Sequence, residues 1–212
     1  MEAIDSGDVA LLREELGDVL MQVVFHADIE ADAGRFTMAD VVDEIARKMV
    51  YRHPHVFADT RADNTEQVLV NWEKLKRTEK GQTTAADTLD SVARTLPQLW
   101  RAEKVQKKAA KAGFDWADIG GALDKLDEET AELRRAVENG VGVEEELGDV
   151  LFAAVKVGRF AGIDPEEALN GTCEKFIRRF RSMEAAAAAA GTPLQDLSLA
   201  QMEELWQQAK QA

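Results

Sequence analysis

The sequence has few cysteines and prolines, and these shortages exclude whole classes of protein. The single cysteine, Cys173, cannot form a disulfide within the chain and fits a reducing compartment. Only four prolines occur in 212 residues, while alanine, leucine, glutamate and lysine are plentiful, so helices are favoured. No apolar run approaches the roughly 20 residues of a transmembrane helix, and no signal-peptide pattern opens the chain. We therefore expect a cytoplasmic protein that has no membrane partner.

Positive charge is also scarce. The chain has 26 lysine and arginine residues against 40 aspartate and glutamate residues, which gives a net charge of −14. A protein that follows a nucleic-acid backbone needs a basic surface, so a nucleic-acid polymer is not expected as a partner. Free nucleotides remain possible partners, because a divalent cation and a few local lysine and arginine side chains can meet their phosphates.

The pattern of apolar residues predicts an all-α fold. No stretch alternates between polar and apolar residues over the length of a strand, whereas apolar residues recur at helical spacing between capping residues and glycines. Residues 52–57 contain Pro54 and are expected to form an extended turn. The expected helices are 8–33, 37–53, 65–80, 96–113, 118–139, 143–161, 164–190 and 198–210.

Two of these helices have apolar stripes that we expect to face the core. The stripe of helix 118–139 consists of Leu123, Leu126, Thr130, Leu133 and Val137. That of helix 143–161 consists of Leu147, Leu151, Ala154 and Gly158.

The chain carries the phrase Glu-Leu-Gly-Asp-Val-Leu twice, at 15–20 and at 146–151. Glycines at 34 and 162 follow the two copies, so a tandem duplication of one helical unit explains the likeness. Only the second copy is preceded by an acidic helix. We therefore predict an incomplete, structural N-terminal half at 1–80, a polar linker at 81–95 and a catalytic C-terminal half at 96–212.

Four carboxylates of the second half are arranged as candidates for a metal site. Glu129 and Glu132 lie three residues apart on one helix, and Glu146 and Asp149 lie three apart on the next, so each pair shares a helix face. Two such helices joined by a glycine turn can present all four carboxylates to one point. The four negative charges then repel one another unless a cation binds between them. The oxygen ligands fit Mg²⁺, with Mn²⁺ as a substitute.

Basic and aromatic residues follow this acidic pair of helices. Lys175 and Arg179 are four residues apart on one helix face, and Trp206 and Lys210 are spaced in the same way. The cations suit phosphate oxygens and the indole suits a base. With a metal nearby, water would attack phosphorus while a carboxylate accepts its proton. This composition is typical of metal-assisted hydrolysis of a phosphoanhydride.

The acidic pattern Glu128-Glu129-x-x-Glu132 followed by Glu146-x-x-Asp149 resembles the motif of the MazG-type nucleoside triphosphate pyrophosphohydrolases, within the all-α NTP pyrophosphatase superfamily. Segments 52–59, 113–116 and 174–180 also look like MazG segments, so the resemblance covers essentially the whole chain. It implies Mg²⁺-dependent hydrolysis of free nucleoside triphosphates to the monophosphate and pyrophosphate, by a homodimer of helical bundles, in nucleotide pool control or house-cleaning.

The resemblance also implies roles for individual residues. The metal ligands and catalytic carboxylates carry over to Glu129, Glu132, Glu146 and Asp149. The substrate contacts carry over to Lys175, Arg179, Trp206, Lys210, Arg52 and Lys76.

Two alternatives remain at this point. One is a non-catalytic helical dimerisation protein derived from the same family. The other is a pyrophosphohydrolase specialised for dUTP or for a damaged nucleotide. For Glu14, Glu15 and Asp18 of the first half a structural role is expected, because their partner helix is absent.

Overall fold

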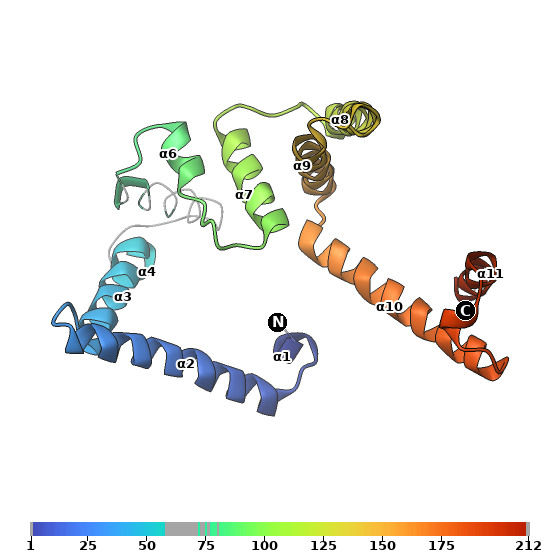
Figure 1. Cartoon of the computed structure of the whole chain (residues 1–212). Coiled ribbons are helices and arrows are strands. Elements are labelled where there is room, and N and C mark those ends of the chain that lie inside the picture. Colours follow the sequence, from blue (N-terminus) through green and yellow to red (C-terminus); the bar gives the residue numbers. More distant parts are fainter. Residues whose placement is uncertain (1, 58–71, 73–74, 76, 80, 211–212) are drawn as a thin grey trace. The chain divides into compact units, whose positions relative to one another are not determined.

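The computed structural model describes residues 2–57, 72, 75, 77–79 and 81–210, and all regular structure in them is helical (Figure 1). The predicted all-α fold class is therefore confirmed. The chain separates into two compact units, Met1–Thr83 and Thr84–Ala212. The break falls close to the predicted end of the first half.

The first unit contains α1 (Glu2–Asp5), α2 (Val9–Asp32), α3 (Met38–Arg52) and α4 (Pro54–Phe57). The Asp8 carboxylate caps α2, and Thr37 forms a capping box at the start of α3, as the sequence indicates. Residues 52–57 were expected to be extended, and this expectation was wrong. His53 leaves the helical region before Pro54, but the proline then occupies the first position of the short helix α4. The predicted helix 65–80 lies mostly outside the described residues.

The second unit contains α6 (Ala85–Asp90), α7 (Gln98–Lys111), α8 (Ile119–Asn139), α9 (Val143–Ala161), α10 (Pro165–Ala189), the 3₁₀ helix η1 (Leu194–Asp196) and α11 (Leu199–Ala209). Helix α6 lies inside the segment expected to be a polar linker. A capping box starts it, in which the Thr84 hydroxyl accepts from the Asp87 backbone N–H and the Asp87 carboxylate accepts from the Thr84 backbone N–H. The short helix then packs on α7.

Helices α8 and α9 form an antiparallel hairpin, which is the most extensive helix pair of the second unit. The connection uses Gly140 and Gly142, whose φ angles of 69° and 76° lie in the left-handed region that suits glycine. Small residues, Ala122 and Ala136 on α8 and Ala153 on α9, are buried in the hairpin region and allow close packing.

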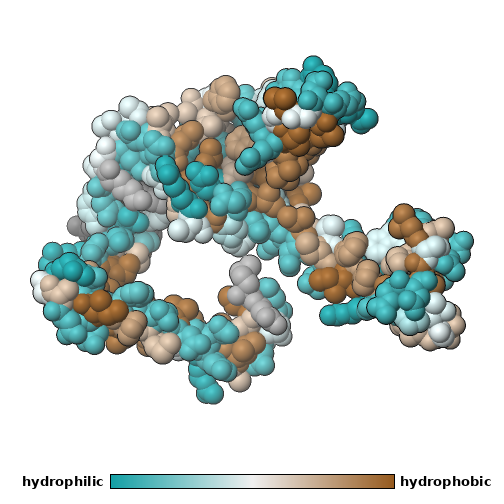
Figure 2. Space-filling view, in the orientation of Figure 1, coloured by the Kyte–Doolittle hydropathy of each residue, from teal (hydrophilic) through white to brown (hydrophobic). Residues whose placement is uncertain are grey.

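The apolar stripes predicted to face inward do not form this buried surface. Leu123 and Val137 on α8 are 45% and 60% exposed, and Leu147 and Leu151 on α9 are about half exposed. The stripe predictions were therefore wrong for these four residues in the single chain, whereas Leu126 and Leu133 are half-buried. The physical reason is that the small residues Ala122 and Ala136 on α8 and Ala153 on α9 let the two helices approach closely on a neighbouring face, which leaves the bulky side chains at the surface (Figure 2).

Two polar contacts connect the other helices to the hairpin and to each other. The Gln106 side chain of α7 is buried and donates to the Phe152 carbonyl of α9 at 2.8 Å. The Trp100 indole N–H of α7 donates to Asp164, the residue that caps α10, at 2.8 Å. These bonds fix α7 beside α9 and hold the start of α10. Within the described part of the chain, every helix is too short or too polar to span a membrane.

Candidate metal and nucleotide site

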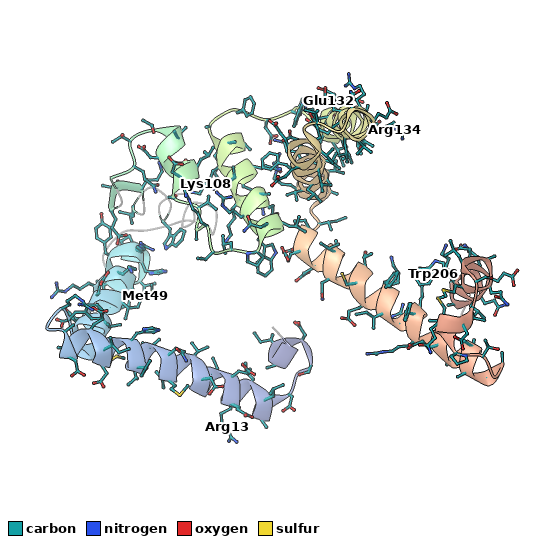
Figure 3. All side chains as sticks on the ribbon, viewed as in Figure 1. Arg13, Met49, Lys108, Glu132, Arg134 and Trp206 are labelled. Atoms are coloured by element: carbon teal, nitrogen blue, oxygen red, sulfur yellow. The ribbon has the colours of Figure 1, made fainter. Side chains whose placement is uncertain are left out.

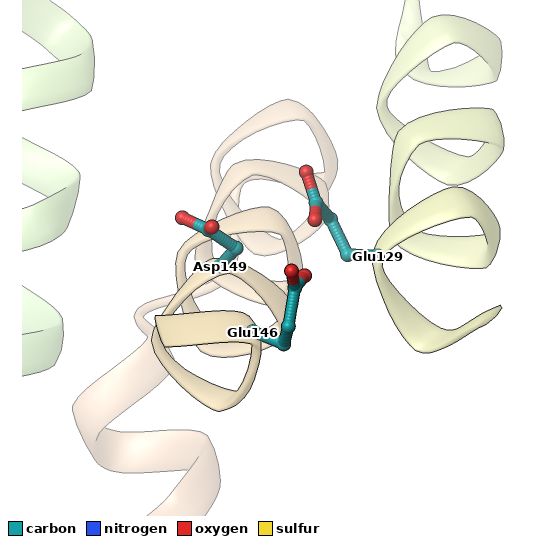
Figure 4. Close-up of side chains that lie close together, drawn as sticks. All are labelled: Glu129, Glu146 and Asp149. Carbon is teal, nitrogen blue, oxygen red and sulfur yellow. The ribbon is translucent and has the colours of Figure 1, made fainter. Parts of the chain in front are cut away.

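Three of the four predicted carboxylates meet in the α8–α9 hairpin. Glu129 of α8 and both Glu146 and Asp149 of α9 each offer one oxygen, and these three oxygens lie within 4.8 Å of one another (Figure 4). Glu129 is only 6% exposed, Glu146 is partly buried and Asp149 is exposed. The group is therefore anchored in the protein on one side and open to solvent on the other.

Local structure explains how the two helices present these side chains. The Asp118 side chain caps α8 by accepting from the Gly120 backbone N–H at 2.8 Å. Helix α9 begins directly after Gly142, which places Glu146 in its first turn. Negative charge is favoured at a helix N-terminus because the unpaired backbone N–H groups carry partial positive charge. Asp149 follows one turn later on the same face.

The electrostatics of the cluster favour a cation. Burial raises the pKa of Glu146 above its ordinary value, and the charges of Glu132, Glu129, Asp149 and Glu145 raise it further. An acid whose ionised form is disfavoured by its neighbours gains most from a positive charge among them. Three carboxylate oxygens at short range are also the donor type that a hard divalent cation prefers. The residues present therefore fit such an ion.

Glu132, the fourth predicted ligand, does not join the three-oxygen group. Its carboxylate lies 3.2 Å from the Arg135 guanidinium, one turn along α8. Its charge nevertheless acts on Glu146 and helps to raise the pKa of that residue. The structure thus brings three of the four carboxylates together and places the fourth beside them. Their roles as ligands stay predictions.

Lys125 is a neighbour of the cluster that the sequence reading missed. Its Nζ atom lies 2.6 Å from Glu129 and 2.8 Å from Glu128. Hydrogen bonds to Glu128 and then to Glu129 raise the pKa of Lys125 above its ordinary value, so it stays charged. The available signal was the lysine four residues before Glu129, a spacing that places both on one helix face. Glu128 itself is exposed and pairs with this lysine.

The predicted nucleotide-contacting residues lie on α10 and α11. The Trp206 ring is 5.1 Å from the Phe176 ring, and the Arg179 guanidinium lies 5.8 Å from the Trp206 centroid. Lys175 and Lys210 are exposed. Figure 3 labels Trp206 on α11, where this helix packs along α10. Phe176 was not among the predicted residues, although its position three residues before Arg179 places it on the same face.

This aromatic and basic group is separate from the carboxylates in the chain as described. No hydrogen bond or ion pair joins Lys175, Arg179, Trp206 or Lys210 to the acidic cluster among the residues that the structure describes. Their predicted contact with a bound nucleotide stays a prediction.

Of the two predicted contacts from the first half, Arg52 is engaged elsewhere. Its guanidinium lies 2.7 Å from Glu79, and its side chain is only 10% exposed. The same guanidinium lies 5.8 Å from the centroid of the Trp72 ring. Lys76 lies outside the described residues. The first copy of the acidic phrase, with Glu14, Glu15 and Asp18, is exposed on α2.

Comparison with known proteins identifies a family model that matches two segments of this chain. The model of the MazG nucleotide pyrophosphohydrolase domain matches residues 1–57 and 121–183, one segment in each unit. This chain belongs to the MazG family. The second segment contains all four predicted carboxylates together with Lys175 and Arg179. The match in both units agrees with the tandem duplication expected from the repeated phrase.

Relatives of this MazG chain match it almost from end to end. It is 45% identical over 99% of its length to the nucleoside triphosphate pyrophosphohydrolase of Escherichia coli (strain K12), covering 81% of that protein. It is 40% identical over 99% of its length to the nucleoside triphosphate pyrophosphohydrolase/pyrophosphatase MazG of Thermotoga maritima, covering 80%. The uncharacterized protein YabN of Bacillus subtilis is 48% identical over the whole chain, which spans 44% of that longer protein. The predicted family and enzyme class are confirmed.

Proposed function

We propose that this MazG chain hydrolyses free nucleoside triphosphates to the monophosphate and pyrophosphate, in a reaction that depends on Mg²⁺ and accepts Mn²⁺. The observation that carries the proposal is the meeting of Glu129, Glu146 and Asp149 oxygens within 4.8 Å in the α8–α9 hairpin. The names of the Escherichia coli and Thermotoga maritima relatives support the same substrate class. Removal of unwanted nucleotides from the pool follows as the cellular role.

The three clustered carboxylates are the proposed metal ligands, and Glu132 is proposed to turn from Arg135 to join them. A divalent cation supplies positive charge that attracts the phosphate oxygens and stabilises the charge that develops on them. The protein contributes the ligand oxygens and the rigid hairpin that holds them. One carboxylate of the cluster accepts the proton of the water that attacks the α-phosphorus. The bond from that phosphorus to the bridging oxygen breaks, and pyrophosphate leaves.

The basic and aromatic residues are proposed to bind the nucleotide. Arg179 has the planar guanidinium that grips phosphate oxygens in pairs, and Lys175 adds a point charge one turn away. The Trp206 indole offers a flat surface to a base, and Lys210, the C-cap residue of α11, lies one turn further along the chain. Arg52 and Lys76 are the proposed contacts from the first half, and Arg52 would have to leave Glu79 to act.

We also propose that the chain works as a homodimer. Large apolar side chains on α2 and α8 are exposed in the single chain, where water would surround them (Figure 2). Exposed apolar surface of this extent is typical of an interface. A second copy can cover each of these two faces with its own apolar surface, as in most symmetric oligomers. The residues concerned are Leu16, Val19, Leu20, Val23, Leu123 and Val137.

Release of pyrophosphate from each common NTP and dNTP, with Mg²⁺ and with Mn²⁺, tests the proposal. We expect turnover with Mg²⁺, and a loss of at least 100-fold in Glu129→Gln, Glu146→Gln and Asp149→Asn, because each removes a ligand charge. Glu144→Gln is the matched control, since this exposed residue lies in the same turn of α9 as Glu146. Full turnover in any of the three cluster variants would contradict the assignment.

Substitutions at equivalent positions of the two copies of the repeat test which half of the chain is catalytic. Glu15 and Asp18 occupy the positions in the first phrase that Glu146 and Asp149 occupy in the second. We propose that residues 96–212 carry the catalytic half and that 1–80 is structural. The double variant Glu15→Gln/Asp18→Asn should therefore retain turnover while Glu146→Gln loses it.

Two competing functions give different results in the same experiments. A non-catalytic dimerisation protein would show no pyrophosphate release from any nucleotide and no heat of Mg²⁺ binding at millimolar metal. An enzyme specialised for dUTP or for a damaged nucleotide would bind Mg²⁺ but release pyrophosphate from only one class of substrate. The three-carboxylate cluster favours metal binding, and hence an enzyme, over the dimerisation protein.

A further inference from the structure

A group of three charged side chains lies where α8 begins and α9 ends, with Lys156 buried, Arg159 largely buried and Asp115 20% exposed, and the proposed chemistry does not use it. Asp115, in the loop before α8, accepts from one Arg159 guanidinium nitrogen at 2.6 Å on each of its two oxygens. It also lies 2.9 Å from Lys156 Nζ. Lys156 and Arg159 both belong to α9, and their side chains are only 8% and 13% exposed. Asp115 therefore connects the loop before α8 to the last turns of α9.

The next residue of the loop contacts both helices. Lys156 Nζ lies 4.7 Å from the centroid of the Trp116 ring. The same ring fills the space over Gly121 in the first turn of α8, where any added side chain would overlap the indole. The loop thus packs on α8 through Gly121 and on α9 through Lys156. It closes the end of the hairpin that lies opposite the Gly140–Gly142 turn.

The carboxylate cluster lies between these two ends. Asp149 is seven residues before Lys156 on α9, or about 10 Å along the helix axis. Glu129 is ten residues after the start of α8, or about 15 Å along that axis. The separation of Glu129 from Glu146 and Asp149 therefore depends on how the two helices are held at both ends. Errors of only about 1 Å in such a group are enough to cost about 100-fold in activity.

Stability alone is a poor explanation for this arrangement. Buried ion pairs contribute little to folding, because removing the charges from water costs about as much as their attraction returns. Two buried cations against one carboxylate also leave an excess positive charge. Apolar side chains would fill the same space at lower cost. What the charges do provide is a directional connection from one loop residue to two positions one turn apart on α9.

We propose that Asp115 is a positioning residue for the carboxylate cluster: its contacts with Lys156 and Arg159 hold the loop before α8 on α9 and thereby set the distance between Glu129 and the Glu146–Asp149 pair. Trp116 and Gly121 complete the connection on the side of α8. The catalytic consequence rests on the proposed function, whereas the effect on helix spacing does not.

The first experiment measures the helix spacing without any metal. Spin labels at Asp127→Cys on α8 and Ala154→Cys on α9, both exposed positions, are placed in a Cys173→Ser background. The distance distribution is recorded in the presence of a chelator. We expect Asp115→Asn to broaden it or shift its centre by about 1 Å or more. The control Asp124→Asn removes an exposed aspartate from α8 and should leave the distribution unchanged.

The second experiment uses Mg²⁺ titration by calorimetry and pyrophosphate release. Residues that orient metal ligands typically change metal affinity about 10–100-fold when replaced, so we expect Asp115→Asn to weaken Mg²⁺ binding by at least about tenfold. Turnover at saturating Mg²⁺ should fall as well, by up to about 100-fold, because a shift of about 1 Å in such a group is enough for that loss. Asp115→Glu, which keeps the charge, should recover part of the affinity, and Asp124→Asn should match the parent.

Two outcomes would overturn the proposal. One is a folded Asp115→Asn variant with an unchanged distance distribution. The other is a lower melting temperature with unchanged Mg²⁺ affinity, which would reduce Asp115 to a purely stabilising role. If the parent protein releases no pyrophosphate from any nucleotide, the proposed function fails. The label distances in chelator still decide whether Asp115 positions the helices.

Discussion

At the scale of single residues, the carboxylate cluster combines burial with repulsion. Glu129 is buried beside Glu146 and Asp149, and Lys125 supplies a nearby positive charge to Glu129. The pKa of Glu146 is raised by burial and by the surrounding acids. Such a group destabilises the metal-free fold, and local strain of this kind is common at functional sites. This leads to an observable trade-off between stability and function.

Replacing Glu146 by Gln should stabilise the metal-free protein and abolish its response to metal. Gln has nearly the same shape as Glu but removes one of the mutually repelling charges. In chelator, we expect the melting temperature of Glu146→Gln to exceed that of the parent. On addition of Mg²⁺ the parent should become more stable by mass action, whereas the variant should respond little. Thermal unfolding followed by circular dichroism measures both effects.

Glu144→Gln is the control for this pair of measurements. It removes one negative charge from the same turn of α9 and should keep the Mg²⁺ response of the parent. A melting temperature of Glu146→Gln below that of the parent in chelator would contradict the account of repulsion.

Replacing Asp115 should destabilise the fold at neutral pH, because it takes the carboxylate away from Lys156 and Arg159 even though the complete group adds little to folding, and this effect should disappear in acid. Burial works to raise the pKa of Asp115, but hydrogen bonds and attraction from Lys156 and Arg159 outweigh this, and the pKa lies below its ordinary value of 3.8. A carboxyl with a depressed pKa stabilises the fold above its unfolded pKa and loses that contribution as pH falls through the folded pKa. The melting temperatures of the parent and Asp115→Asn should therefore differ at neutral pH and converge below pH 3.8. A difference that persists unchanged into acid would show that charge is not its origin.

At the scale of helices, the α8–α9 hairpin depends on its two turn glycines. Gly140 and Gly142 both have positive φ, which a residue with a Cβ adopts only at a cost. Because a left-handed backbone costs such a residue roughly 1–2 kcal/mol, Gly142→Ala should lower the free energy of unfolding by about that amount. Urea unfolding measures the change.

A helical glycine gives the matched comparison with the opposite sign. Gly171 lies within α10, and an added Cβ there meets no atom within 4 Å. Since glycine in a helix is about 0.5–1 kcal/mol less stable than alanine, Gly171→Ala should raise the free energy of unfolding by about this amount. A Gly142→Ala variant as stable as the parent would contradict the left-handed turn at Gly142, and a loss of stability in Gly171→Ala would contradict the helical assignment of Gly171.

At the scale of the whole molecule, the exposed apolar faces predict self-association. Sedimentation or light scattering should give about twice the chain mass of 23.4 kDa. Introducing charge into the exposed stripe of α2, with Val19→Glu and Leu20→Glu together, should shift the protein toward the monomer, because buried charge without a partner is costly. Arg13→Glu, at an exposed polar position of the same helix, should leave the dimer intact (Figure 3). A monomeric parent protein at micromolar concentration would contradict the prediction.

The sequence by itself determined the helical elements and the family. Helix limits followed from local chemistry, because the caps at Asp8, Thr37, Asp118, Asp164 and Ser198 satisfy backbone N–H groups within a few residues. The acidic motif was equally visible, since residues three apart share a helix face whatever surrounds the helix. The short helices α4 and α6 were missed because they are only four and six residues long and lack an apolar repeat.

Only the tertiary structure decided which side chains meet and which surfaces stay exposed. The spacing of residues along a helix does not reveal that Glu129, Glu146 and Asp149 converge, because this depends on how α8 and α9 pack. It does not reveal either that Glu132 pairs with Arg135 instead. Nor can it tell that Asp115 reaches Lys156 and Arg159 from 41 and 44 residues away in the chain. The leucine stripes of α8 and α9 were misassigned for the same reason. Periodicity identifies an apolar face, but close packing of alanines decided which face this chain buries.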